Sequence, residues 1–521
     1  MARTALQWLS LVGIIWLQSV SGTNTNFPAY SSQLKQLLSM SQLQLNNLAF
    51  ASDAGKIFGF ISGIAALHLP LWLVLLIGST LGLIGYGLQF LLVSNYIHSL
   101  SYVHLFLLTV IAGNSVCWMN TVCYVIAIRN FPCDRQVAVG LSTSYQGLSA
   151  MIYTTMVDVL FSSFPTQRAR AYLLLNSIVP LLVSLVTTVF VREINVTDGK
   201  SMKFGFVIIF VITICTGIYA VLGSLKSLFP GLSPLSNAIG ISVFLAAPLL
   251  VPFKEVIRDI SVDNREIKVH DFTAEENIGV DVMQISVKEG EGDNGNDTPE
   301  VGVSFVKEEI GVILMLKRVD FWLYFFVYFF GATLGLVYLN NLGQIAESRS
   351  CPGTSSLVSL SSSFGFFGRI IPSLMDFLLS RRRYVISRPA FIAALMAPMA
   401  GAFFLLLSPT DTSLYISTAV IGVSTGAITS VAVSTTTELF GTKKFSVNHN
   451  IVVANIPIGS FIFGYLAALL YHKEENGNGK CMGLQCYKTT FITWGSLCYL
   501  GTILALILHC RMQKFYASQK S

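Results

Sequence analysis

The chain has 521 residues, of which 53% are hydrophobic and only 12% are charged, and its formal net charge is +6. Soluble domains carry about 25% charged residues, so a chain of this length has too few charges to be a soluble protein. These values indicate a protein embedded in a lipid bilayer.

Apolar runs separated by short polar hinges recur along almost the whole chain. A helix needs ~20 apolar residues to span the hydrocarbon core, and a lipid-exposed backbone must satisfy its own hydrogen bonds, which favours helices. The layout of six, two and six runs indicates an all-α membrane transporter in two parts. We predict about fourteen transmembrane helices, at 7–27, 47–67, 71–93, 103–127, 136–162, 170–191, 204–229, 235–253, 319–342, 354–379, 389–408, 412–436, 448–471 and 489–510.

One hydrophilic segment, residues 254–318, interrupts this pattern. It holds 15 acidic and 8 basic residues, and its centre is rich in glycine and poor in aromatic residues. Such a composition is typical of a disordered tether. The predicted organisation is therefore a six-helix bundle, two inserted helices, a disordered charged cytosolic loop, a second six-helix bundle and a cytosolic tail, at 1–192, 193–253, 254–318, 319–511 and 512–521.

The distribution of basic residues predicts that both termini are cytosolic. With this orientation fifteen bases fall on the inner side and eight on the outer side, the long loop excluded, as the positive-inside rule requires. The sequons at Asn195 and Asn296 then lie in the cytosol and stay unglycosylated. The first run also has the layout of a signal peptide, whose cleavage would leave an odd thirteen helices, so we favour its retention.

Asp53 and Lys56 are ionisable residues within the second run. A charged group near the middle of a spanning helix costs roughly 2.5–3.5 kcal/mol on insertion scales, and residues three apart share a helix face and can pair. One interpretation is an internal ion pair beside a strip for close helix packing formed by Gly55, Gly59 and Gly63. The other is a charged site on a translocation path, where Asp53 changes partner and protonation during transport.

Arg369 lies well inside the tenth run, with no acidic residue within a helical turn. A guanidinium cannot be neutralised by losing a proton, so it must find an anion, a set of carbonyl groups or water. A substrate carboxylate and a structural clamp to another helix are both consistent with the sequence.

Further polar side chains occur within the apolar runs. Amide groups and an indole N–H can bind a polar solute, but they can equally join helices, and both interpretations stay open. Together with Asp53, Lys56 and Arg369 they form the predicted substrate path: Asn114, Trp118, Asn120, Gln146, Asn341 and Gln344.

Cys481 and Cys486 share the last predicted outer loop. An oxidising outer face would permit a disulfide between them. A zinc site is not expected, since no second pair of cysteine or histidine residues lies nearby in the sequence.

Many short motifs in one order resemble the plant nodulin-like branch of the major facilitator superfamily, of the Nuclear-Fusion-Defective type. The resemblance covers nearly the whole chain apart from the charged loop. Its motifs include Asp53-x-Gly55-Lys56, Trp118-x-Asn120-Thr121, Arg129-Asn130-Phe131-Pro132, Asn341-Leu342-Gly343-Gln344, Phe367-Gly368-Arg369, Glu438-Leu439-Phe440-Gly441 and Cys481-x4-Cys486.

The resemblance implies two six-helix halves around a central cavity, with two extra helices between them. It also implies a transporter, and the name of the branch reflects a link to the fusion of nuclei (karyogamy) in plant reproductive cells. The facilitator signature between the second and third helices is absent, because 63–72 contains no Asp, Arg or Lys. A partial version of this signature occurs at the end of the tenth run, as Asp376 followed by Arg381–Arg383. We assign a gating or cytosolic motif to Asp376, Arg381, Arg382 and Glu438.

The predicted function is secondary transport of a small polar solute or organic anion by alternating access, with protons as a candidate coupling ion through Asp53. The expected partners are the solute, protons and the lipid bilayer; no cofactor, metal or nucleic acid is expected. The seven histidines are dispersed, which argues against an enzyme site. The alternative is a membrane receptor or scaffold that transports nothing.

Overall fold

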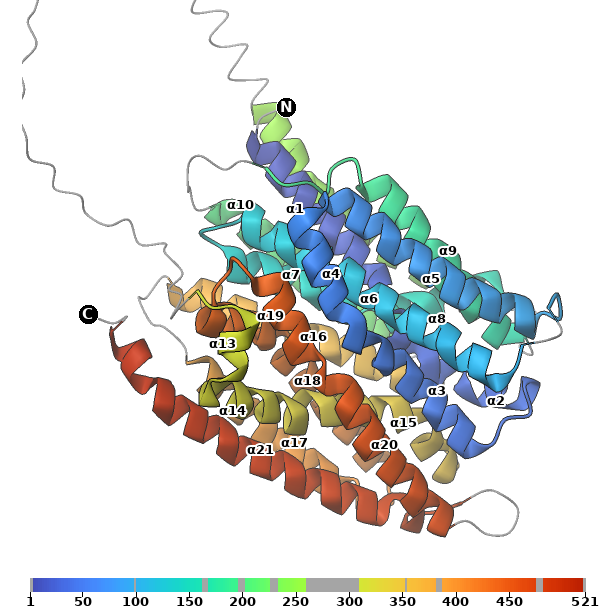
Figure 1. Cartoon of the computed structure of the whole chain (residues 1–521). Helices are drawn as coiled ribbons and strands as arrows, with labels where there is room; N and C mark the ends of the chain where they lie inside the picture. Colours follow the sequence, from blue (N-terminus) through green and yellow to red (C-terminus); the bar gives the residue numbers. More distant parts are fainter. Residues whose placement is uncertain are drawn as a thin grey trace, which may run out of the picture.

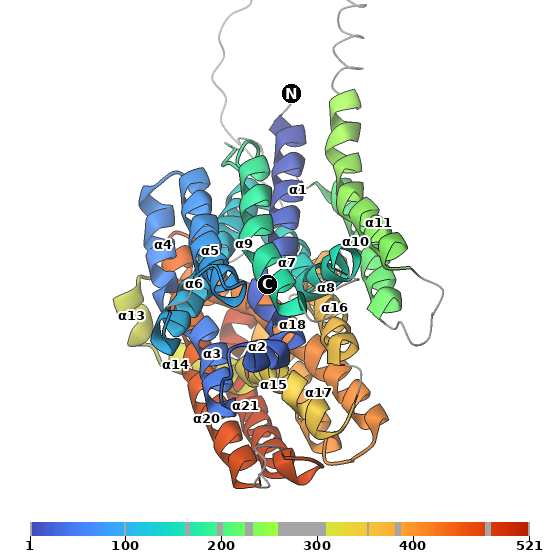
Figure 2. The ribbon, with the colours of Figure 1, turned by 90° about the vertical axis from the view of Figure 1, so that its right-hand side faces the viewer.

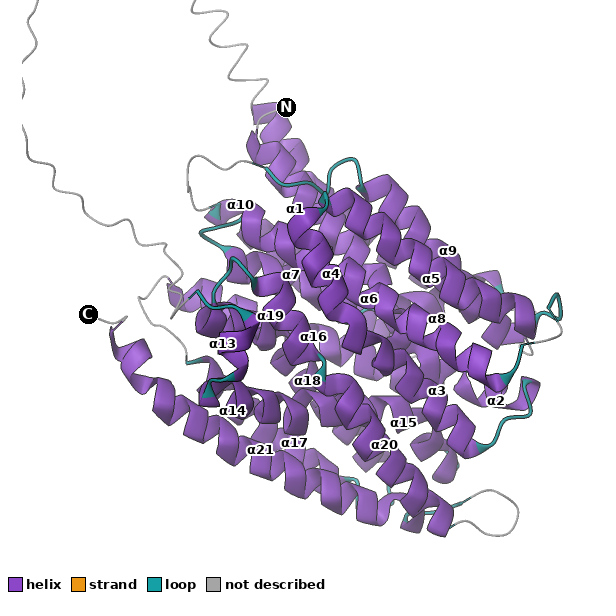
Figure 3. Cartoon of the chain, viewed as in Figure 1, coloured by secondary structure: helices purple, strands orange, loops and turns teal. Residues whose placement is uncertain are grey.

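The computed structural model describes residues 3–97, 100–161, 167–194, 202–224, 233–258, 309–351, 354–380, 387–474 and 481–518. Within these ranges the chain forms long helices joined by short loops, with no strand (Figures 1 and 3). The first helix begins and the last helix ends at the same end of the bundle (Figure 1). We call this end the termini side and the other end the opposite side.

The first part of the chain supplies the elements before the inserted pair. They are α1 (Arg3–Ser21), η1 (Thr23–Ala29), α2 (Ser31–Leu37), α3 (Gln42–Ala54), η2 (Gly55–Phe58), α4 (Gly59–His68), α5 (Leu71–Val93), α6 (Tyr102–Asn130), α7 (Arg135–Gln146), α8 (Ser149–Leu160) and α9 (Arg168–Thr187). The inserted pair is α10 (Lys203–Ser224) and α11 (Pro234–Ala246), which η4 (Ala247–Leu249) extends towards Arg258.

The second part follows the charged segment. It consists of α13 (Val312–Leu316), α14 (Val319–Tyr328), the π-turn η5 (Phe329–Thr333), α15 (Leu334–Ser348), α16 (Thr354–Ser380), α17 (Arg388–Leu405), α18 (Asp411–Phe440), α19 (Phe445–Val453), α20 (Asn455–Lys473) and α21 (Gln485–Ser518). We refer to α1–α9 and α14–α21 as the two halves.

Thirteen helices of the described residues are long and apolar enough to cross a membrane. The difference from the predicted fourteen lies in the run 136–162, where α7 ends at Gln146 and α8 begins at Ser149. The break packs tightly, because a Cβ at Gly147 would lie 2.6 Å from the backbone nitrogen of Phe366 in α16. Only glycine permits this approach. The run covers the expected length, but as two short helices.

Two other spans also change helical pitch near their middles. The second span passes from α3 through the 3₁₀ turn η2 into α4, and the span Val319–Ser348 contains the π-turn η5. Such interruptions are frequent at functional sites. Here η2 carries Lys56, and the break between α7 and α8 directly follows Gln146.

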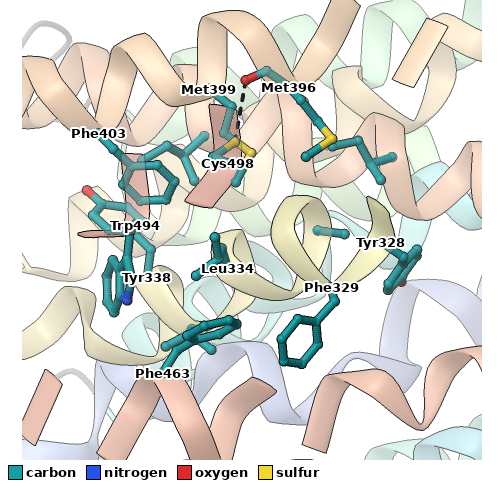
Figure 4. Close-up of a cluster of buried hydrophobic side chains, with 14 of the residues drawn as sticks. Tyr328, Phe329, Leu334, Tyr338, Met396, Met399, Phe403, Phe463, Trp494 and Cys498 are labelled. Atoms are coloured by element: carbon teal, nitrogen blue, oxygen red, sulfur yellow. Dashed lines mark hydrogen bonds between the residues drawn. The ribbon is translucent and has the colours of Figure 1, made fainter. Parts of the chain in front are cut away.

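Each half has its own apolar interior. In the second half, aromatic and methionine side chains of α14, α15, α17, α20 and α21 pack together (Figure 4). The Cys498 thiol donates to the backbone carbonyl of Met396 at 3.4 Å, which joins α21 to α17. Large apolar residues such as Val189, Val243 and Ile313 are exposed, as expected of a surface that faces lipid.

The inserted helices lie against both halves. α10 packs on α16 and on α11, and α11 packs on α8 (Figure 2). The predicted loop 254–318 is in part helical, since the helix after α11 runs to Arg258 and α13 lies within 309–318. Residues 259–308, with Asn296, lie outside the described residues, as does Asn195.

The chain that enters the second half is anchored on the termini side. The Glu309 carboxylate accepts hydrogen bonds from the backbone nitrogens of Thr442 at 3.0 Å and Lys443 at 3.1 Å. The backbone nitrogen of Ile310 donates to the carbonyl of Phe440 at 3.2 Å. These bonds hold the segment before α13 against the loop between α18 and α19.

Candidate functional site

A cavity lined by both polar and apolar side chains lies between the two halves and consists of two adjoining chambers. The Asp53 chamber is bordered by residues that include Asp53, Asn340 and Thr425. The Lys56 chamber is bordered by residues that include Lys56, Tyr124, Tyr328, His449 and Asn450. Five residues border both chambers, so the two spaces form one cavity; they are Asn24, Thr25, Gln146, Leu336 and Arg369.

Asp53 and Lys56 form a buried ion pair, with Lys56 Nζ 2.5 Å from Asp53 Oδ1. Their exposed fractions are only 2% and 7%. The pair spans the junction of α3 with the 3₁₀ turn η2, where side chains three residues apart eclipse one another. The local change of pitch therefore brings together two charges that the sequence places on one face.

The second carboxylate oxygen of Asp53 is bound by the other half of the protein. Asn340 Nδ2 in α15 donates to Asp53 Oδ2 at 3.0 Å, and the Ser460 hydroxyl in α20 donates to the same oxygen. Asp53 thus has partners in both halves, and a movement of one half away from the other would break part of this network.

The Arg369 side chain lies between the chambers without an acidic partner. Its Nη1 donates to Gln146 Oε1 at 2.8 Å and to the Thr143 carbonyl at 3.1 Å. Its Nε is buried and has no hydrogen-bond partner. In the part of the chain that the structure describes, no carboxylate lies within ion-pair distance of this guanidinium.

A chain of amides holds the Arg369 side chain in place. Gln146 accepts from Arg369 through Oε1 and donates through Nε2 to Asn120 Oδ1 at 3.2 Å. Because both ends of the Gln146 amide are used, its orientation is fixed. Arg369 can therefore present its remaining N–H groups to the cavity without reorganising its neighbours.

Several polar residues of the Lys56 chamber are not in the predicted path. They include Tyr124, Tyr328, His449 and Asn450. His449 stacks on Phe445 with ring centroids 5.1 Å apart, and the Tyr124 ring meets His449 edge-on at 5.6 Å. The available signal was the presence of phenol and imidazole groups inside apolar runs, where they also occur as ordinary packing residues.

Four residues of the predicted path lie outside the cavity lining. Asn114 Nδ2 donates to the Gly55 carbonyl at 2.9 Å, and Trp118 Nε1 donates to Asn114 Oδ1 at 2.8 Å, so this pair joins α6 to η2. Asn341 donates to the Val337 carbonyl of its own helix. Gln344 makes a contact between the halves, described next.

Contacts between the halves lie on both sides of the cavity. On the opposite side, Gln344 Nε2 donates to Asn46 Oδ1 at 2.9 Å. On the termini side, Gln136 Nε2 at the start of α7 donates to Thr437 Oγ1 of α18 at 3.3 Å. Nearby, the Ser446 hydroxyl of α19 donates to the Gly63 carbonyl of α4 at 3.0 Å. Hydrogen bonds thus join the two halves on both sides of the cavity.

The predicted gating motif forms part of a buried charge cluster in the second half. Arg388 Nη1 lies 2.6 Å from Asp376 Oδ1, and Arg388 Nε lies 3.0 Å from Glu438 Oε1. Tyr516 donates to Glu438 Oε2 at 2.9 Å. Burial raises the pKa of Tyr516 and the nearby Glu438 charge raises it further, so the phenol keeps its proton and donates. Arg381 and Arg382 lie outside the described residues.

Cys481 and Cys486 form a disulfide on the opposite side. The loop between them reaches the end of α15, where the Gly483 nitrogen donates to the Ser348 carbonyl at 2.7 Å. Gly483 has a φ of +96°, a left-handed conformation that favours glycine. Among the described residues, no group of three or more His, Cys, Asp or Glu side chains could hold a metal ion.

Two helical halves around a central cavity define the fold of the major facilitator superfamily. Solved structures support the assignment of the fold. A peptide transporter POT in complex with sulfate superimposes with a TM-score of 0.54, at 11% identity, over 99% of this chain and 95% of that one. A structure from a study of proton-dependent oligopeptide transporters gives a TM-score of 0.51, at 13% identity, over 98% of this chain and 100% of that one.

The sequence comparisons identify the family. Residues 7–253 match the Nodulin-like family model, and residues 302–518 match that of the NFD4 C-terminal domain. The chain is 38% identical over 533 residues to Protein NUCLEAR FUSION DEFECTIVE 4 of Arabidopsis thaliana, covering 98% of this chain and 89% of that protein. The chain therefore belongs to the nodulin-like family of NUCLEAR FUSION DEFECTIVE 4, which confirms the resemblance seen in the sequence.

Proposed function

We propose that this protein is a secondary transporter that carries a small organic anion through the central cavity by alternating access. In this scheme the halves rock about a fixed site near the middle of the membrane and open it to each side in turn. The contacts at both ends of the cavity support the proposal, because they are the bonds that such a movement would break alternately. The solute passes through chemically unchanged.

The state of Arg369 is the observation that carries the proposal. A guanidinium stays charged in any protein environment, and this one borders both chambers with its Nε unpartnered. A carboxylate that enters the cavity would supply the missing anion through a charge-assisted hydrogen bond. Such a bond contributes about 1.5–3 kcal/mol, enough to select anions over neutral solutes.

Transport in proteoliposomes made with the purified full chain tests the proposal. We expect saturable counterflow of radiolabelled carboxylates, with an apparent affinity that falls roughly 10- to 150-fold in Arg369→Gln, as the loss of one charged hydrogen bond implies. Arg369→Lys keeps the charge but loses the planar guanidinium, so it should recover only part of the affinity.

Arg168→Lys is the matched control, because Arg168 pairs with Asp158 outside the cavity lining. Unchanged carboxylate flux in Arg369→Gln would show that Arg369 is a structural clamp. The absence of saturable counterflow for every solute would favour the alternative of a receptor or scaffold.

Protons are the proposed coupling ion, with Asp53 as the residue that changes protonation. Its carboxylate bonds to Lys56 in one half and to Asn340 and Ser460 in the other. When the halves separate on the opposite side, Asp53 loses partners that stabilise its charge, which favours uptake of a proton from that side.

Both termini are proposed to be cytosolic, on the basis of the basic residues on the termini side. The name of the Arabidopsis relative adds the proposal that transport serves the fusion of nuclei in reproductive cells. A plant line that lacks this protein tests the link, since wild-type protein should restore fusion and Arg369→Gln should not. Epitope tags at the two ends, probed with protease in sealed vesicles, test the orientation.

A further inference from the structure

We propose that the transported anion is an aromatic monocarboxylate, with its carboxylate at Arg369 and its ring against an aromatic wall in the Lys56 chamber. The aromatic wall consists of Tyr124, Phe445 and His449. This inference rests on the proposed transport function and narrows it to one class of substrate. Three features of the chamber support it: its free donors, its net charge and the packing of its rings.

The free donors in the chamber of Arg369 match a single carboxylate. Tyr124 and Tyr328 both border the Lys56 chamber, as Arg369 does. Neither phenol hydroxyl has a hydrogen-bond partner among the residues that the structure describes, and Arg369 Nε is likewise unpartnered. A carboxylate has two oxygens with about four lone-pair sites, so it can accept from the guanidinium and from the phenols together.

The lining of the Lys56 chamber can compensate the charge of one carboxylate but not of two. The lining contains Lys56, Arg369 and His449, and contains no acidic residue. Lys56 is already paired with Asp53, which leaves Arg369 as the one permanent cation of this lining without an anion. A second carboxylate on the ligand would enter a poorly solvated space with no free permanent cation, which is unfavourable. The chamber therefore favours a monovalent anion.

The aromatic wall gives the body of the ligand a surface that suits a flat ring. Phe445 and His449 stack at 5.1 Å with an interplanar angle of 16°, and Tyr124 meets the two rings edge-on, 6.4 Å and 5.6 Å away. The three rings brace one another, so their orientations are set before a ligand arrives. Aromatic pairs gain about 2- to 12-fold in binding beyond the burial of their area.

His449 can keep its place in this wall as a neutral ring. Its Nδ1 lies 3.2 Å from the hydroxyl of Thr436, which itself donates to the Ala432 carbonyl. With the Thr436 hydroxyl proton directed at that carbonyl, a neutral His449 fits the contact as the Nδ1–H tautomer. A neutral imidazole can stack with an aromatic ring and adds no permanent charge to the count above.

Three ligands of matched size test the proposal with the full chain in proteoliposomes. They are 4-hydroxybenzoate, trans-4-hydroxycyclohexanecarboxylate, which lacks only the aromaticity, and terephthalate, which replaces the hydroxyl by a second carboxylate. After subtraction of the leak into protein-free liposomes, we expect Arg369-dependent counterflow of 4-hydroxybenzoate. The alicyclic analogue should bind about 2- to 12-fold more weakly, and terephthalate should compete more weakly than either monoanion.

Phe445→Leu should reduce the preference for the aromatic over the alicyclic ligand while dependence on Arg369 remains. Phe253→Leu is the control, because Phe253 is exposed outside the cavity, and it should change nothing. Three results would overturn the inference but leave anion transport intact: equal affinity of the wild type for 4-hydroxybenzoate and its alicyclic analogue, terephthalate binding as tightly as the monoanions, or Arg369-dependent flux of a non-aromatic anion only. If no anion shows Arg369-dependent flux, the proposed function itself is wrong.

Discussion

Arg369 and Arg388 are two buried arginines of the same half with opposite surroundings. Arg388 meets the carboxylates of both Asp376 and Glu438, whereas Arg369 meets only the neutral groups of Gln146 and Thr143. An arginine with two anions is fully compensated and holds α16, α17 and α18 together. An arginine with none remains available to a ligand. The comparison separates a charge that maintains the fold from a charge that serves binding.

Asp53 stands between these two cases. Its carboxylate is fully used, as in the Arg388 cluster, but its partners belong to both halves of the protein. A compensated charge whose partners move relative to one another can act as a switch, since the compensation exists only in some conformations. Contacts across the halves on the termini side, such as Gln136 with Thr437 and Ser446 with Gly63, are instead neutral.

Replacing Arg388 should give the largest loss of stability. In Arg388→Gln two buried carboxylates lose their cation, and breaking a buried pair in this way costs about 3–5 kcal/mol. We expect a large drop in the thermal unfolding temperature of the detergent-purified protein, followed by tryptophan fluorescence. Arg369→Gln, the matched substitution, removes an uncompensated buried cation and should leave that temperature unchanged or higher. Equal destabilisation by the two substitutions would remove the distinction between the two arginines.

Asp53→Asn should separate accumulation of the substrate from its exchange. The amide keeps the size of the carboxylate but cannot take up and release a proton, so accumulation driven by a proton gradient should be lost. Exchange of labelled for unlabelled substrate needs no net proton movement and should persist. Gln344→Leu is the control, because it breaks a neutral contact between the halves on the same side and should affect both assays alike. Parallel loss of both activities in Asp53→Asn would assign Asp53 a purely structural role.

Most of the architecture could be predicted because the bilayer imposes it on the sequence. The lengths of apolar runs located the spans, and the spacing of Asp53 and Lys56 indicated that the two residues could pair. The break at Gly147 was not predicted, because the run 136–162 is apolar on both sides of it and the close approach of Phe366 comes from a distant part of the chain. A glycine that faces a distant segment leaves no local signal of that contact.

The site was predicted only where a residue is unusual in its own helix. Arg369 stood out as a lone charge in an apolar run. Arg388 was missed because Asp376 and Glu438 lie 12 and 50 residues away in the sequence. Tyr124 and Tyr328 were missed for another reason: a phenol suits a packed interior as well as a binding site, and only the three-dimensional structure shows that theirs border a cavity.

Tyr516→Phe should have the smallest effect, and it sharpens the description of the Arg388 cluster. The substitution removes the hydrogen bond to Glu438 and the one that the Tyr516 hydroxyl accepts from the backbone nitrogen of Arg388 at 3.2 Å, while both ion pairs of Arg388 remain. A hydrogen bond to a charged group contributes about 1.5–3 kcal/mol, so the decrease in unfolding temperature should be smaller than in Arg388→Gln. Tyr499→Phe, on the exposed face of the same helix, should cause no decrease. If Tyr516→Phe matched Arg388→Gln, the end of α21 rather than the ion pairs would hold the cluster together.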